Sequence, residues 1–176
     1  MRTLVLCLLA SSAVASAQDN PLSAFNKMSY GYVKSWLLGS AEKMPAENYT
    51  FKPTDTVRSF GQIIGHAADA QYAFCSPVLG EKGPAGSIEK TKTTKAELIP
   101  ALKDAFAFCD KAYDGMTDAA GVQMVKLFGA DLPKLGALSA NVTHSAEHYG
   151  NVVTYLRMKN IVPPSSDAPP TLAPKK

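Results

Sequence analysis

Several features that would assign a chain of this size to a familiar class are missing or scarce. The formal net charge is only +3 over 176 residues, and the basic residues are scattered, so the sequence lacks the basic surface of nucleic-acid-binding proteins. No stretch approaches the roughly 20 uninterrupted apolar residues that a membrane-spanning helix needs. Glycine-rich phosphate loops and paired catalytic carboxylates do not stand out either. These absences argue against nucleic acid as a partner and against a membrane span.

The N-terminus nevertheless has the features of an export signal. Arg2 precedes an apolar run from Leu4 to Ala10, and residues 15–17 (ASA) form a small-residue cleavage site. We therefore expect residues 1–17 to be a signal peptide and the mature protein to be periplasmic or secreted. The remaining length suits one domain.

Cysteine is rare as well, with three in the whole chain, and Cys7 leaves with the predicted signal. An oxidising compartment makes a disulfide between Cys75 and Cys109 a plausible outcome. Two free buried thiols are the alternative.

Apolar residues recur at helical spacing in four segments. In the first, the apolar residues at that spacing are Leu22, Phe25, Tyr32 and Trp36. Residues 59–62 (SFGQ) and 94–97 (TKAE) fit capping boxes and so mark the starts of the second and third helices. The four predicted helices run from Pro21 to near Met44, from Ser59 to Ser76 with Pro77 as the stop, from Thr94 to about Gly115, and from about Pro133 to Lys159.

The segments between and after these helices are less regular. Residues 77–93 contain three glycines and two prolines, which predicts a long loop. Residues 117–132 stay ambiguous, since 122–128 suit either a short hairpin or a helical turn. Residues 163–176 contain five prolines and no core pattern, so we expect a disordered tail after a domain of residues 18–162.

Four helices with one apolar face each predict an all-α four-helix bundle. The cysteines bear on its topology. If the second and third helices were antiparallel neighbours, Cys109 would lie about 21 Å of helical rise from the end that holds Cys75. Parallel helices would bring both cysteines to one end, and we therefore favour an up-down-down-up bundle with a Cys75–Cys109 disulfide.

The three histidines suggest a metal site. His144 and His148 lie four apart on the fourth predicted helix, so both imidazoles share one face. His66 lies in the inward stripe of the second helix. Three imidazoles leave a position open for water or substrate, as in catalytic zinc sites. Asp69 is a candidate acceptor for an imidazole N–H, with a solvated helix charge as the alternative.

Two passages that include these histidines resemble the DinB family. One is residues 144–151 (HSAEHYGN), followed by 155–157 (YLR) and 161–164 (IVPP). The other is residues 51–53 (FKP) with 57–66 (VRSFGQIIGH). The resemblance implies an up-down-down-up four-helix bundle with a divalent metal held by three histidines, here His66, His144 and His148. The family includes low-molecular-weight thiol S-transferases and a thiol-dependent isomerase.

The resulting hypothesis is a metal-dependent thiol transferase or hydrolase that acts on a small molecule. Zinc, nickel, iron and manganese all suit three imidazoles. Asn151 and Tyr155 are candidate catalytic residues, with a satisfied polar residue and a core aromatic as the alternative interpretations. The competing hypothesis is a non-catalytic exported bundle that binds a metal or ligand. An open polar mouth beside the histidines would favour the enzyme, and a closed apolar plug would favour the alternative. Homodimer formation stays open.

Overall fold

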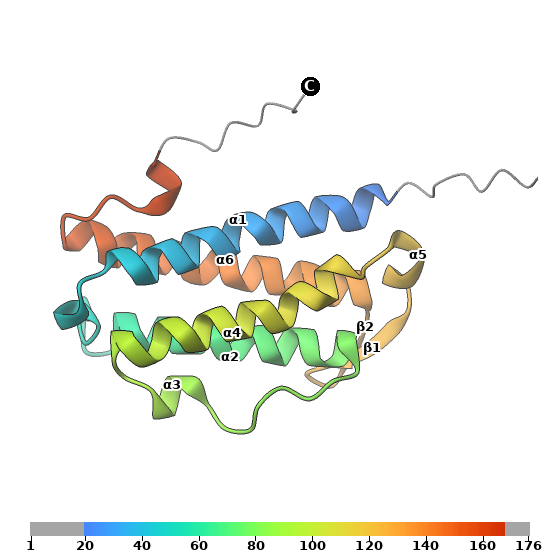
Figure 1. Ribbon diagram of the computed structural model, residues 1–176, viewed down its shortest axis with the longest axis horizontal. Coiled ribbons are helices and arrows are strands. Elements are labelled where there is room, and N and C mark those ends of the chain that lie inside the picture. Colours follow the sequence, from blue (N-terminus) through green and yellow to red (C-terminus); the bar gives the residue numbers. More distant parts are fainter. Residues whose placement is uncertain (1–19, 168–176) are drawn as a thin grey trace, which may run out of the picture.

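The computed structural model describes residues 20–167, so the predicted signal peptide of residues 1–17 and residues 168–176 of the predicted tail lie outside the described residues. Four long helices form the domain, as the sequence predicts: α1 (Pro21–Lys43), α2 (Phe60–Leu79), α4 (Lys95–Asp114) and α6 (Lys134–Met158). Figure 1 shows them packed side by side in a bundle. Within residues 20–167 no helix is both long and apolar enough to cross a lipid bilayer.

The bundle has the predicted up-down-down-up topology. In Figure 1 α2 and α4 run in one direction while α1 and α6 run in the other. The crossover between the two parallel helices contains a short helix, α3 (Ile88–Thr91), where the sequence predicted only loop. Cys75 and Cys109 lie near the C-terminal ends of α2 and α4 and form a disulfide, with their Cα atoms 5.4 Å apart. This bond is possible because both helices end on the same side of the bundle.

Both predicted capping boxes are present. The Ser59 hydroxyl accepts a hydrogen bond from the Gln62 amide, and the Gln62 side chain accepts one from the Ser59 amide. Thr94 and Glu97 form the same reciprocal pair at the start of α4. Each pair satisfies two backbone donors that the helix itself cannot use, so the starts of α2 and α4 are fixed by local sequence.

The predicted end of α2 was wrong. The helix continues through Pro77 to Leu79, although proline removes one backbone hydrogen bond. Val78 is buried in the core, and Gly80 ends the helix in the left-handed conformation with φ 70°. Burial of Val78 and the glycine cap offset the lost hydrogen bond.

The predicted buried face of α1 was also wrong at its N-terminal end. Leu22 and Phe25 are 64% and 66% exposed, whereas Ser23 and Asn26 are buried. Asn20 does not cap α1 with its own side chain; instead the Asp118 carboxylate accepts hydrogen bonds from the amides of Leu22 and Ser23. The first turn of α1 is therefore oriented by a residue far away in the sequence.

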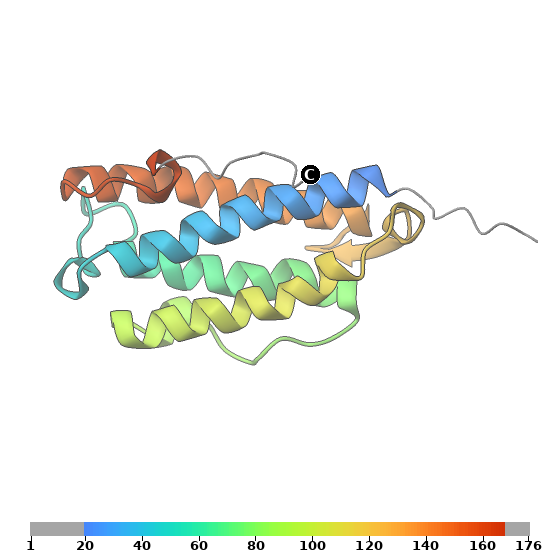
Figure 2. The same cartoon turned by 45° about the horizontal axis from the view of Figure 1, so that its top comes forward.

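Residues 117–133 resolve the ambiguity of the sequence in favour of a hairpin. A short helix, α5 (Asp118–Gly121), leads into β1 (Met124–Leu127) and β2 (Ala130–Pro133), which pair antiparallel with Val125 opposite Leu132. Figure 2 shows the hairpin at one end of the bundle, beside the end of α2 and the start of α6. The hairpin is thus next to the helices that carry the histidines.

Residues 163–167, which follow the predicted domain, lie against the bundle. A 3₁₀ helix, η2 (Pro164–Ser166), packs on the bundle, much as η1 (Ala46–Asn48) fills the turn after α1. The Tyr149 hydroxyl hydrogen-bonds both the side chain and the amide of Ser165. Lys43 forms an ion pair with Asp167. Residues 164–167 of the proline-rich segment are therefore bound to α1 and α6.

Candidate metal centre

The three histidines meet between α2 and α6. One nitrogen from each of His66, His144 and His148 lies within 4.8 Å of the other two. The His148 ring centroid is 4.7 Å from that of His66 and 4.4 Å from that of His144. The i, i+4 spacing on α6 places two imidazoles on one face, and the packing of α2 on α6 supplies the third. All three imidazoles are within reach of a single ion.

His148 has the least explained environment of the three. Its side chain is 6% exposed, and neither Nδ1 nor Nε2 has a hydrogen-bond partner among residues 20–167. A buried polar atom without a partner costs about 1–3 kcal/mol, so folded proteins rarely keep one without a use. An imidazole with a free, buried lone pair suits a divalent ion of borderline softness.

The same burial keeps the ligand set neutral. Desolvation lowers the pKa of His148 to about 4, and the neighbouring His144 and His66 add to the effect. Burial, followed by the proximity of His66, also lowers the pKa of His144. Metal ligation needs the unprotonated imidazole, so both α6 histidines are ready for a metal near neutral pH.

Because the α6 histidines are neutral in the folded state, we expect the stability of the metal-free protein to depend on pH. A histidine whose pKa falls on folding binds fewer protons in the folded state, so its contribution to stability is complete above about pH 6.5 and is lost as the pH falls toward 4. We expect the free energy of unfolding in EDTA to fall more steeply between pH 6.5 and 4.5 for the wild type than for His148→Leu. Urea titrations at both pH values would measure the free energy of unfolding. An equal loss between pH 6.5 and 4.5 in the two proteins would contradict the prediction.

Glu89 orients the third histidine. Its Oε2 lies 3.0 Å from Nδ1 of His66, and Arg58 Nε donates to its Oε1 at 2.8 Å. Although partial burial opposes ionisation, the hydrogen bonds from Arg58 and His66 lower the pKa of Glu89. An ionised carboxylate at Nδ1 makes that nitrogen the N–H donor and leaves Nε2 with its lone pair. Carboxylate partners of this kind fix the ring orientation of metal-ligating histidines and raise their basicity.

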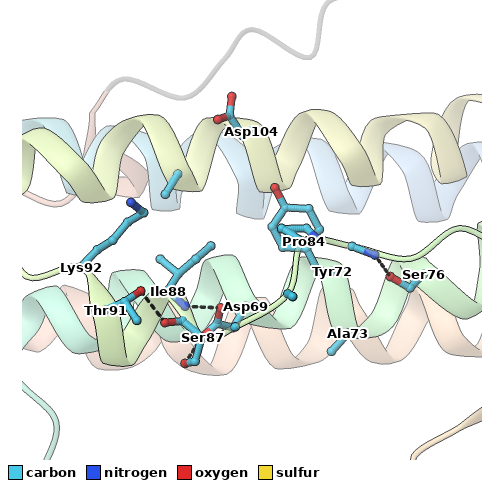
Figure 3. A pocket seen from close by; sticks show the side chains of 14 residues that line it. Asp69, Tyr72, Ala73, Ser76, Pro84, Ser87, Ile88, Thr91, Lys92 and Asp104 are labelled. Carbon is cyan, nitrogen blue, oxygen red and sulfur yellow. Dashed lines mark hydrogen bonds between the residues drawn. The ribbon is translucent and has the colours of Figure 1, made fainter.

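Asp69 holds Glu89 in place and does not itself contact an imidazole. Its carboxylate accepts hydrogen bonds from the Ser87 hydroxyl and from the amides of Ile88 and Glu89. Figure 3 shows the first two of these contacts at the start of α3. Asp69 is therefore neither the predicted acceptor for an imidazole nor the alternative, a solvated helix charge, because the crossover occupies its carboxylate.

Gly65 allows the backbone of α3 to lie close to α2. A Cβ atom at residue 65 would lie 2.7 Å from the Cα of Glu89, which is closer than real Cβ contacts permit. Only glycine lets the backbone of α3 approach α2 beside His66. Glu89 was missed in the sequence because it follows a glycine-rich segment far from His66 in the chain. A glycine directly before the histidine was the one signal for a close backbone approach.

We expect Glu89→Ala to weaken zinc binding by about 10- to 100-fold, the range for lost outer partners of metal-ligating histidines. Competition with a chromogenic chelator would measure the affinity. Glu147→Ala is the matched control because Glu147 lies beside His148 on α6 but is exposed and forms no hydrogen bond or ion pair with the three histidines. An equal loss in both variants would mean that only the local negative charge matters.

A cavity of about 610 Å³ opens beside His148. Arg58, Asn151, Thr154 and Tyr155 are among the residues that line it. The two candidate catalytic residues are thus both at the mouth of the histidine cluster. The Tyr155 hydroxyl donates to the backbone carbonyl of Arg58 at 2.6 Å, and burial raises its pKa. Tyr155 therefore positions Arg58, whereas the exposed side chain of Asn151 faces the cavity and is the better candidate for a substrate contact.

A larger cavity, of about 690 Å³, lies between α2, α4 and the crossover. Figure 3 shows it from close by, with Tyr72, Ile88 and Lys92 around it. None of the three histidines lines it. It therefore adds no chemical group to the candidate metal centre.

A buried polar network fixes the register of α6 against α2. Asn141 Nδ2 donates to Gln71 Oε1 at 2.9 Å and to the Tyr113 hydroxyl at 3.2 Å, and Gln71 Nε2 donates to Ser145 Oγ. Asn141 and Ser145 lie within one turn of His144 on α6, and Gln71 lies on α2 beyond His66. A network of this kind specifies one alignment of two helices better than apolar contacts do, so it holds the two halves of the site in register.

The family model described as the DinB superfamily matches residues 35–152. This segment reaches from α1 into α6 and contains all three histidines. The chain belongs to the DinB superfamily. The resemblance carried by residues 57–66 and 144–151 is confirmed by this match. No curated protein matches the chain.

Solved structures of DinB-like proteins have the same fold. A DinB-like protein from Bacillus cereus aligns with a TM-score of 0.71 at 14% identity, over 81% of this chain and 95% of that one. YjoA, a DinB-like protein from Bacillus subtilis, has a TM-score of 0.61 at 20% identity, over 80% and 92%. YfiT from Bacillus subtilis, described as a probable metal-dependent hydrolase with an unusual four-helix bundle topology, has a TM-score of 0.61 at 13% identity, over 88% and 94%.

Proposed function

We propose that this member of the DinB superfamily binds one divalent ion through His66, His144 and His148 and hydrolyses a small molecule with it. The observation that carries the proposal is His148, whose two buried ring nitrogens lack a hydrogen-bond partner in the described part of the chain and lie at the edge of an open cavity. The description of YfiT as a probable metal-dependent hydrolase supports the same class of reaction. Zinc, nickel, iron and manganese all fit three imidazoles, so the native metal is left unassigned.

The residues present fit such an ion. Two neutral imidazoles from α6 and a third one oriented by Glu89 would supply three nitrogen ligands, and the cavity beside His148 would admit water or substrate. A divalent ion held there would lower the pKa of a bound water or thiol and so supply a nucleophile near neutral pH. Asn151, which lines the cavity, would hydrogen-bond the substrate, and the Arg58–Glu89 pair would keep His66 in its orientation.

Hydrolysis is favoured over thiol S-transfer by the compartment that we propose. Export is predicted from residues 1–17, and the Cys75–Cys109 disulfide supports an oxidising environment. The familiar low-molecular-weight thiol cofactors are cytoplasmic and scarce outside the cell membrane. Water, by contrast, is available in every compartment.

The competing proposal is a non-catalytic bundle that holds a metal or a ligand. The cavity beside His148 favours the enzyme, because polar groups from Arg58, Asn151 and Thr154 line it and it opens to solvent. A site that served only the stability of the fold would have no need of such access.

The experiment is a turnover screen with the protein stripped of metal and reloaded with each of the four ions. Small esters, lactones and amides test hydrolysis, and a thiol with an electrophilic acceptor tests S-transfer. We expect turnover with at least one ion, a strong reduction in Asn151→Ala, and none in His148→Leu. Stoichiometric metal binding without turnover on any substrate would favour the non-catalytic bundle.

A further inference from the structure

Phe128 has an unusual backbone conformation for an aromatic residue. It opens the turn between β1 and β2 with φ 49°, followed by Gly129 with φ 87°. Two positive φ values in a two-residue hairpin turn favour asparagine or aspartate followed by glycine. A bulky side chain is strained there, and such strain is retained where it serves a function.

Packing does not explain why phenylalanine stands at this position. Its side chain is 75% exposed, so little of the ring is removed from water. The hairpin is attached by other residues: Leu127 is 4% exposed, and Val125 and Leu132 pack against the core. A large exposed apolar side chain that the packing of its own hairpin does not require is a candidate contact for a ligand.

The ring of Phe128 is linked to the histidine cluster through a single aromatic residue. Its centroid is 5.3 Å from that of Phe74 in an edge-to-face contact, and the Phe74 centroid is 5.4 Å from that of His144. Phe74 is buried, whereas Phe128 is open to solvent. The two rings form an apolar wall from the hairpin to the metal ligands, on the α6 side that leads away from Asn151 and Tyr155.

We infer that the wall formed by Phe74 and Phe128 binds an aryl or branched alkyl substituent of the substrate while its reacting group lies at the metal centre. The inference rests on the proposed function and adds the substrate class: a small electrophile with an apolar substituent at one end and a polar group at the other. The polar end is directed to Asn151 and Thr154, which line the cavity on the other side of His148. An aromatic ring on Phe128 would gain edge-to-face or offset-stacked contacts.

Two hydroxamates that differ only in their apolar part test this arrangement. Acetohydroxamate binds a metal and carries a methyl group, whereas biphenyl-4-carbohydroxamate carries two rings that would extend along Phe74 toward Phe128. On the zinc-loaded protein, calorimetry is expected to show tighter binding of the biphenyl compound. In Phe128→Asn this advantage is expected to fall by about fivefold to tenfold, with acetohydroxamate binding unchanged. Asparagine suits the turn, so the variant keeps the hairpin.

Met124→Ala is the matched control, because Met124 is an exposed apolar residue of β1 in the same hairpin. It should leave both affinities unchanged. An unaltered preference for the biphenyl compound in Phe128→Asn would overturn the aromatic wall and leave the metal centre standing. If neither hydroxamate binds the zinc-treated wild type, the proposed metal function fails and the inference fails with it.

Discussion

Replacement of His148 by leucine is expected to abolish metal binding and to stabilise the metal-free protein. The loss of affinity should exceed the 10- to 100-fold range expected when a hydrogen-bond partner of a ligating histidine is removed, because here the ligand itself is removed. The gain in stability arises because leucine removes two buried ring nitrogens that have no hydrogen-bond partner among the residues that the structure describes. Such a group costs about 1–3 kcal/mol, so the free energy of unfolding should rise by about that amount.

Urea unfolding in EDTA and zinc titration by calorimetry measure the two effects. Asn141→Leu is the matched control, since Asn141 is a buried polar residue of the same helix. Its amide donates to Gln71 Oε1 and to the Tyr113 hydroxyl, and the variant would leave the buried Gln71 oxygen without its donor. We expect Asn141→Leu to destabilise the protein. If His148→Leu destabilises it equally, His148 is a packing residue and the metal centre is wrong.

Removal of the Cys75–Cys109 disulfide is expected to lower the free energy of unfolding by about 3–4 kcal/mol. The bond closes a loop with a sequence separation of 34 residues. Cross-linking such a loop restricts the unfolded chain, and the entropy model gives a value of this size. In this model the effect depends on the number of residues in the loop, and this loop is long because it contains the whole crossover between two parallel helices.

The Cys75→Ala and Cys109→Ala double variant tests this value by urea denaturation. Because both cysteines are fully buried, alanine also removes packed sulfur atoms. Unfolding the wild type in dithiothreitol keeps the sulfur atoms and separates the two contributions. An unchanged midpoint with reductant would show that the bond does not restrict the unfolded chain as expected.

The sequence was sufficient for the features that depend on local spacing. Capping boxes at Ser59 and Thr94 located two helix starts, since each box needs only four residues. The i, i+4 spacing of His144 and His148 placed two ligands on one face because a helix repeats every 3.6 residues. The direction of α4 relative to α2 followed from the reach of a disulfide between Cys75 and Cys109. The capping boxes and the histidine spacing rest on the geometry of a single helix, whereas the helix direction rests on the fixed reach of one covalent bond.

The features that the sequence did not reveal depend on contacts between distant segments. Glu89 reaches His66 only because Asp69 and Gly65 bring α3 against α2. The exposure of Leu22 and Phe25 follows from the hydrogen bonds between Asp118 and the first turn of α1. No local sequence pattern predicts this contact. Similarly, Pro77 suggests a helix end until the buried Val78 is known. In each case a tertiary contact overrides a local preference.

The most direct test of the metal centre is elemental analysis of the purified protein beside the double variant His144→Ala/His148→Ala. Both samples should be purified without chelators and reconstituted with a mixture of zinc, nickel, iron and manganese. Circular dichroism would establish that the variant keeps its helices. We expect close to one divalent ion per wild-type chain and none in the variant. Equal metal contents in the two proteins, including none in either, would contradict a site built from His66, His144 and His148.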